Sequence, residues 1–265
     1  MTTIRPLLAS SLAALATLWA TLLANPAAAQ PAPAAATHTV PDTIAQRVAA
    51  CTACHGQEGR ATNHGYFPRI AGKPAGYLYN QLVHFRDGQR HYALMTHLLA
   101  HLTDAYLLEI ATYYAGLDVP YPAPQVTRAP AALLERGRQL VLEGDRARGI
   151  PACAACHGAA LTGMQPAVPG LLGLPRDYLN AQVGAWKTGQ RRATQPDCMA
   201  EIAAKLLPQD IEAASTWLAS QPVPTGNKPL AAGSLKLPLP CGSALESHGA
   251  AHGATAANAT AGGAK

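Results

Sequence analysis

Apolar residues recur at helical spacing along most of the chain. The pattern predicts helices in three clear stretches, at 75–86, 105–115 and 131–143. In the first, Leu78, Leu82 and Phe85 share one face. A shorter helix is expected after Asp42, which is a candidate N-cap. No stretch alternates as a half-buried strand does, so the sequence predicts an all-α protein.

The second part of the chain repeats the first. The segment from Tyr77 to Arg90 aligns with that from Tyr178 to Arg191, with Tyr, Leu, Gln, an aromatic residue, a base, Gly, Gln and Arg recurring in register at an offset of 101 residues. Such self-similarity indicates two copies of one small domain. Proline-rich residues separate the copies. The expected organisation is domain 1 at 41–117, a linker at 118–130, domain 2 at 131–222 and a C-terminal extension at 223–265, largely disordered after 241.

The N-terminus has the pattern of an export signal. Arg5 precedes an apolar run at 7–23, which ends among alanines. Residues 1–29 are therefore predicted to be a signal peptide, with 30–40 a flexible leader and the mature protein in a periplasm. A retained membrane anchor is the alternative, because the run is slightly shorter than the ~20 residues that span a bilayer. Pro26 and the alanines favour cleavage.

Composition narrows the class further. The chain has 265 residues and a formal net charge of +5, but its basic residues form no block, so nucleic acid is not an expected partner. With two Phe and three Trp, two cores would be short of aromatic side chains unless a large flat group filled them.

Four of the six cysteines lie in two C-x-x-C-H motifs, 102 residues apart. Two thiols that add to one edge of a porphyrin, followed by an imidazole for its iron, are typical of covalent haem attachment. The predicted cofactors are two haem c groups, held by Cys51, Cys54 and His55 in the first copy and by Cys153, Cys156 and His157 in the second. A zinc site is the alternative, but it leaves each histidine unexplained.

Each haem iron needs a second axial ligand. Met95 follows His55 by 40 residues, and Met199 follows His157 by 42. A thioether would close the coordination sphere and raise the reduction potential, which suits electron transfer. The alternative for each methionine is core filling. Met164 has no counterpart and is expected to be packing.

Histidines are competing ligands around the first haem. None has a histidine counterpart in the second copy, so surface or haem-edge positions are expected for them. These residues are His84, His91, His97 and His101.

These motifs together resemble the dihaem cytochrome c4 family over about residues 42–221. The resemblance rests on the first C-x-x-C-H-G motif, the 67–72 loop, the 77–88 helix, Met95 with Leu102-Thr-Asp104, and 110–115. It implies two class I cytochrome c domains related by a pseudo-twofold axis, with His55/Met95 and His157/Met199 as iron ligands. It also implies that the Pro68 and Pro169 carbonyls receive the ring N–H of the ligand histidines. The second loop, 168–173, departs from the family pattern.

Two cysteines remain: Cys198, directly before Met199, and Cys241, which lies outside this resemblance. An oxidising compartment favours a disulfide between them. The other interpretation is a Cys198 thiolate ligand to the second haem, which would lower its potential. Farther on, His248 and His252 have helical spacing for a metal, but the surrounding Gly and Ala favour a solvated tail.

The predicted function is electron transfer rather than catalysis. The leading hypothesis is a periplasmic shuttle from a quinol-oxidising complex or dehydrogenase to a terminal oxidase, with transient docking to a membrane complex. The second is the cytochrome subunit of a periplasmic dehydrogenase for thiosulfate, sulfide or an alcohol. The third is a dihaem peroxidase, which two methionine ligands disfavour. The sequence leaves the oligomeric state open.

Overall fold

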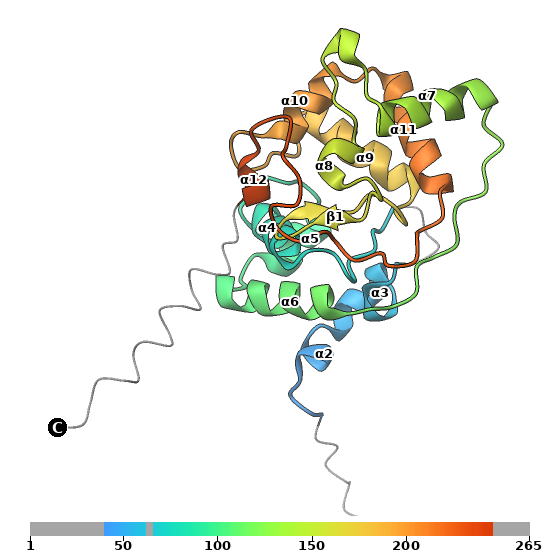
Figure 1. The fold of residues 1–265 in the computed structure, drawn as a ribbon. Coiled ribbons are helices and arrows are strands. Elements are labelled where there is room, and N and C mark those ends of the chain that lie inside the picture. The colour runs from blue at the N-terminus through green and yellow to red at the C-terminus, as the bar shows by residue number, and fades with distance from the viewer. Residues whose placement is uncertain (1–39, 62–65, 246–265) are drawn as a thin grey trace, which may run out of the picture. The chain divides into compact units, whose positions relative to one another are not determined.

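The computed structural model describes residues 40–61 and 66–245, and helices dominate this part of the chain (Figure 1). The first half contains α2 (Ile44–Arg47), α3 (Thr52–His55), α4 (Ala75–Arg86), α5 (Ala93–Leu99) and α6 (Asp104–Gly116), with 3-10 turns at Ala49–Cys51 and Gln57–Gly59. The second half contains α7 (Ala131–Leu142), α8 (Ala154–His157), α9 (Arg176–Lys187), α10 (Cys198–Lys205) and α11 (Pro208–Ser220), with a 3-10 turn at Arg146–Arg148. A last short helix, α12, spans Gly242–Leu245.

The predicted helices agree closely with α4, α6 and α7, and the all-α prediction is confirmed apart from one small hairpin. Strand β1 (Gly163–Met164) pairs antiparallel with β2 (Val168–Pro169). Two residues a strand are too few for alternation to show in a sequence. The expected N-cap at Asp42 is wrong, because Thr43 caps α2 by accepting from the Gln46 amide at 3.3 Å.

The first half packs α4 against α5 and α6. Its buried core combines apolar residues of these helices with Val48 from the segment before the first cysteine. Thr103 caps α6, where its hydroxyl accepts from the Tyr106 amide at 3.3 Å. The fully buried Leu107 lies one turn farther along the same helix.

The second half is built around the crossing of α7 and α11. A Cβ atom at Gly137 of α7 would lie 2.2 Å from the Ala213 carbonyl oxygen, so the close crossing requires glycine there. Helix α9 packs on α11 and α10, and the buried core includes Val141, Leu179 and Leu218.

The segment after α11 forms a strap on the second half, which we define as residues 223–245. Its Leu230 exchanges backbone hydrogen bonds with the hairpin, donating to Gly163 at 2.9 Å and accepting from Gln165 at 2.8 Å. A third cluster places Met164, Val168 and Ala244 together, with leucines of the strap around them. Disorder was expected after 241, whereas Gly242–Leu245 is helical.

Some predictions fall outside the described residues. They are the signal peptide, most of the leader and the His248/His252 tail. Within residues 40–61 and 66–245, no helix is both long and apolar enough to cross a membrane.

Candidate functional site: two haem attachment sites

The first attachment motif occupies one tight helical turn. Cys51 ends a 3-10 turn, and Cys54 and His55 lie on α3 directly after it. The His55 Nδ1 lies 2.9 Å from the Pro68 carbonyl oxygen. A carbonyl only accepts, so Nδ1 carries the proton, and Nε2 keeps the lone pair that an iron requires. The expected contact with Pro68 is confirmed.

Glycine directly after the histidine permits this geometry. Gly56 has φ of +74°, a region that L side chains rarely adopt. A Cβ there would lie 2.4 Å from the Ala61 carbonyl oxygen. The chain can therefore turn away from α3 at once and bring the 66–70 loop to the histidine.

The second motif repeats the arrangement. Cys153 precedes α8, which carries Cys156 and the buried His157. The His157 Nδ1 lies 2.7 Å from the Pro169 carbonyl oxygen, which fixes the same tautomer and confirms the second expected contact. The four thiols are not joined to one another, and burial raises the pKa of Cys153 to about 11. In both halves, half-buried free thiols are held beside a histidine with a free Nε2.

The proposed methionine ligands lie on equivalent short helices. Met95 is on α5 and packs against the first core, and Met199 is the second residue of α10. Both side chains are half-buried. Their ligation stays a prediction. Met164 is 4% exposed and belongs to the third cluster, in agreement with a packing role.

The competing histidines have different environments. His84 is buried on α4, while His91, His97 and His101 are exposed. Burial, reinforced by the charges of Arg191 and Arg90, lowers the pKa of His84 to about 4. Its imidazole is therefore neutral near pH 7.

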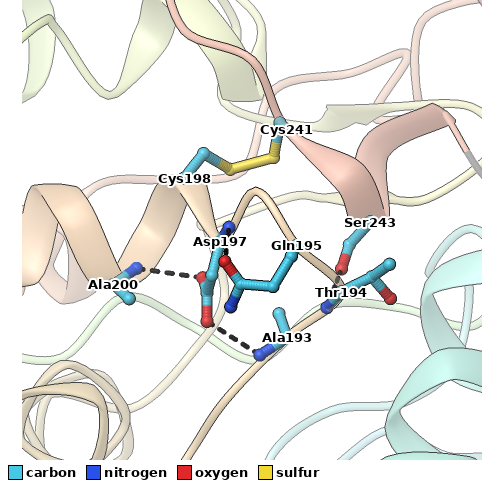
Figure 2. The surroundings of a disulfide bond; sticks show 8 residues. All are labelled: Ala193, Thr194, Gln195, Asp197, Cys198, Ala200, Cys241 and Ser243. Atoms are coloured by element: carbon cyan, nitrogen blue, oxygen red, sulfur yellow. Dashed lines mark hydrogen bonds between the residues drawn. A yellow bond between two sulfur atoms is a disulfide. The ribbon is translucent and has the colours of Figure 1, made fainter.

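A disulfide joins Cys198 to Cys241, with the Cα atoms 5.0 Å apart (Figure 2). The disulfide interpretation is confirmed, and a Cys198 thiolate ligand is wrong because this sulfur is already bonded. The disulfide thus ties the strap to the first residue of α10, the helix that carries Met199.

Asp197 and Ser243 make further hydrogen bonds beside the disulfide, at the start of α10 (Figure 2). The Asp197 carboxylate accepts from the Ala200 amide at 3.0 Å and from the Ala193 amide at 2.7 Å. The Ser243 hydroxyl accepts from the Thr194 amide at 3.1 Å. Helix capping and a covalent tie together fix where α10 begins.

The two halves meet through a two-fold set of contacts. The His91 amide donates to the Gln190 carbonyl at 2.8 Å, and the Arg192 amide donates to the Gln89 carbonyl at 2.7 Å. The two bonds are equivalent, because His91 and Gln89 correspond to Arg192 and Gln190 at the offset of 101 residues. The aligned segments therefore meet as equivalent surfaces, as in an isologous interface.

Two arginines lie at the centre of this interface, 7% and 6% exposed. Arg90 donates to Gln81 at 2.9 Å and to the Tyr178 hydroxyl at 3.1 Å, and Arg191 donates to Gln182 and to Gln81, both at 2.9 Å. Each guanidinium also lies over an aromatic ring, Arg90 on Phe85 at 4.3 Å and Arg191 on Trp186 at 3.8 Å. Within the described residues, neither makes an ion pair with a carboxylate.

These features fit a haem in each half. Haem c requires two thiols that bond to the porphyrin and a histidine with a free Nε2 for the iron. The buried arginines are cations without an acidic partner in the described part, and buried charges are normally paired. The propionates of a haem are anions that would pair with them. The repeat showed that both arginines recur, but it did not show that they meet.

The sequence was compared with protein families and with curated proteins. No protein-family model matches the chain. A curated relative named thiosulfate dehydrogenase electron acceptor, from Thiomonas intermedia, is 39% identical over 176 residues, which cover 66% of this chain and 80% of the relative. Cytochrome c4 from Pseudomonas aeruginosa is 34% identical over 174 residues, covering 65% of this chain and 84% of the relative.

Solved structures are similar over the same region. The crystal structure of reduced cytochrome c4 from Pseudomonas stutzeri has a TM-score of 0.58 and 30% identity, covering 66% of this chain and 95% of that one. Thiosulfate dehydrogenase from Marichromatium purpuratum has a TM-score of 0.60 and 32% identity. The match covers 65% of this chain but 36% of that longer chain.

Proposed function

The chain belongs to the dihaem cytochrome c4 family, and from that membership we propose that it is a periplasmic electron shuttle, with His55/Met95 and His157/Met199 as the iron ligands. Family membership confirms two tandem class I cytochrome c domains and two covalently bound haems. It also establishes electron transfer between redox proteins as the general role. Export through residues 1–29 and domain limits at 41–117 and 131–222 are part of the proposal.

One observation carries the proposal more than any other. The thiol–thiol–histidine turn and its Nδ1 bond to a proline carbonyl occur in both halves, at 2.9 Å and 2.7 Å. When bound, each haem supplies a one-electron iron couple. The carbonyls hold each imidazole in the tautomer that leaves Nε2 for iron and strengthen its basicity. A methionine sulfur opposite would leave no open position for a substrate, which favours transfer over catalysis.

The interface suits a relay between the halves. Arg90 and Arg191 link α4 and α9, since Arg90 donates to Gln182 of α9 and Arg191 donates to Gln81 of α4, and both would bind the propionate anions. Buried, fixed cations do not need to reorganise when an electron moves, because they are already in place.

A direct test uses the purified holoprotein. It should take up two electrons at two closed, six-coordinate haems, each with a thioether-to-iron absorption band, and it should be oxidised rapidly by a terminal oxidase. Peroxide turnover or a high-spin haem would instead indicate an enzyme.

A dehydrogenase subunit is the second candidate, and a specific observation supports it. Relatives from Thiomonas intermedia and Stutzerimonas stutzeri, 39% and 35% identical, are named thiosulfate dehydrogenase electron acceptor. Stopped-flow mixing with a thiosulfate dehydrogenase and thiosulfate tests it. Reduction at rates matching enzyme turnover supports this candidate, and its absence supports the general shuttle.

A further inference from the structure

Lys73 is a buried amine that reaches from the first half into the second. It is 4% exposed and directly precedes Pro74, the N-cap of α4. Its Nζ donates to the Gly170 carbonyl at 2.7 Å, across 97 residues of sequence. Gly170 follows Pro169, whose carbonyl accepts from His157. The ammonium thus lies one peptide away from the bond that orients the second proximal histidine.

The equivalent contact cannot form in the other direction. With the offset of 101 residues, Lys73 corresponds to Leu174, which is buried and apolar. Arg69 corresponds to Gly170, where a Cβ would lie 2.6 Å from the Thr162 carbonyl oxygen. The interface is otherwise two-fold, so Lys73 introduces a difference between two similar sites.

No acid among the described residues pairs with this amine. Within the described residues Lys73 makes no salt bridge, and the nearby charged group that acts on it is Arg69, another cation. Burial chiefly, then the charge of Arg69, lowers the pKa of Lys73 to about 7. The hydrogen bond to Gly170 therefore holds this amine beside the peptide segment that orients His157.

We infer that Lys73 is a positioning residue of the first half that raises the reduction potential of the haem bound at His157 relative to the haem bound at His55. A ferric iron carries one more positive charge than a ferrous one. A nearby buried cation therefore favours the reduced form, and weak screening in the interior makes the effect larger than at a surface. The inference rests on the proposed haem ligation at His157.

Its consequence is a direction for the relay. With otherwise matched ligands, the first electron would settle on the second haem, because Leu174 offers no corresponding charge to the first. The first half would then pass electrons on toward the second.

The test measures the midpoint potential of each haem in the holoprotein. A Met95→His background lowers the first haem's potential and separates the two waves. Measured below pH 7, where Lys73 is protonated, Lys73→Met should lower the second midpoint by about 59 mV, a tenfold change in a one-electron equilibrium. Lys73→Arg should retain most of the wild-type value. Lys236→Met removes the same charge from an exposed position and should leave both midpoints in place.

The outcomes separate this inference from the ligand assignment. If the second haem lacks the thioether band in the parent protein, the proposed ligand set is wrong. Whatever that ligand is, an unchanged second midpoint in Lys73→Met overturns the inference. Equal shifts of both midpoints would overturn it too, because a merely structural role predicts lower stability without a shift confined to one haem.

Discussion

The two halves attach haem alike but support the methionine side differently. In the first half, α5 leaves Leu94 and Leu98 58% and 61% exposed. In the second half, α10 begins at Cys198, which is tied to the strap through Cys241. The proximal turn is the same in both halves, because covalent haem attachment needs two thiols and a histidine. The surroundings of the two methionines are not held to one pattern by that chemistry, and they differ.

The interface also combines residues that recur in both halves with a residue that occurs in one half only. Arg90 and Arg191 are related by the repeat and serve both halves equally. Lys73 serves one half only. Matched iron ligands would therefore not require equal potentials or equal stabilities, and each difference can be removed separately.

The largest expected effect is loss of one haem. Replacing Cys153 and Cys156 by serine removes the thioether bonds of the second half and should leave one haem per chain, with about half the haem absorbance. Intact mass and a haem stain after denaturation measure this. The matched change at Cys51 and Cys54 should keep the other haem. Retention of two haems in either variant would contradict the assignment.

The next largest effect is expected from removing the disulfide between Cys198 and Cys241. Loop-closure entropy for a separation of 43 residues predicts that Cys198→Ser with Cys241→Ser lowers the free energy of unfolding by about 4 kcal/mol. This loss of stability should be confined to the second half, because the disulfide is attached to the first residue of α10. Denaturant titration followed at both thioether bands measures this, and the first haem is the internal control. Equal losses at both haems would show that the strap supports the whole molecule.

The features that the sequence predicts and those that it does not differ in how far apart along the chain the contacting residues lie. The C-x-x-C-H turns, α4 and α6 depend on neighbours within a few residues, so the sequence pattern was sufficient. The proline carbonyl contacts were expected through the family resemblance. The contact of Lys73 with Gly170 spans 97 residues and involves no motif, so no local rule could indicate it. The bridge between Met164 and Leu230 spans 66 residues and likewise follows no local rule, whereas the β1–β2 hairpin is local but too short for its alternation to show.

Exchange of the methionines sharpens the comparison at the iron. Met95→His and Met199→His should each lower the midpoint of their own haem by on the order of 100 mV, within the ~0.8 V that axial ligands cover. Each should also remove one thioether band. Spectroelectrochemistry of both variants measures the shifts. A variant that keeps both bands would show that its methionine fills the core instead.

The smallest predicted effect is a pH dependence of one haem. Below a pH of about 7 Lys73 is protonated, and its charge favours the ferrous second haem. As pH rises through about 7 the charge is lost, so the second midpoint should fall by no more than the shift expected for Lys73→Met. Arg69 remains a cation throughout, and Leu174 cannot titrate, so the first haem should lack this component. By linkage, reducing the second haem should in turn raise the pKa of Lys73.

Midpoints measured from pH 6 to pH 8 in wild type and Lys73→Met isolate this component, because propionates titrate in both proteins and cancel in the difference. The difference between the two proteins should be large at the acid end and small at the alkaline end. A difference independent of pH would mean that Lys73 stays charged throughout, held by an anion such as a propionate. The asymmetry between the halves would then be a fixed property of the fold, since no proton would adjust it.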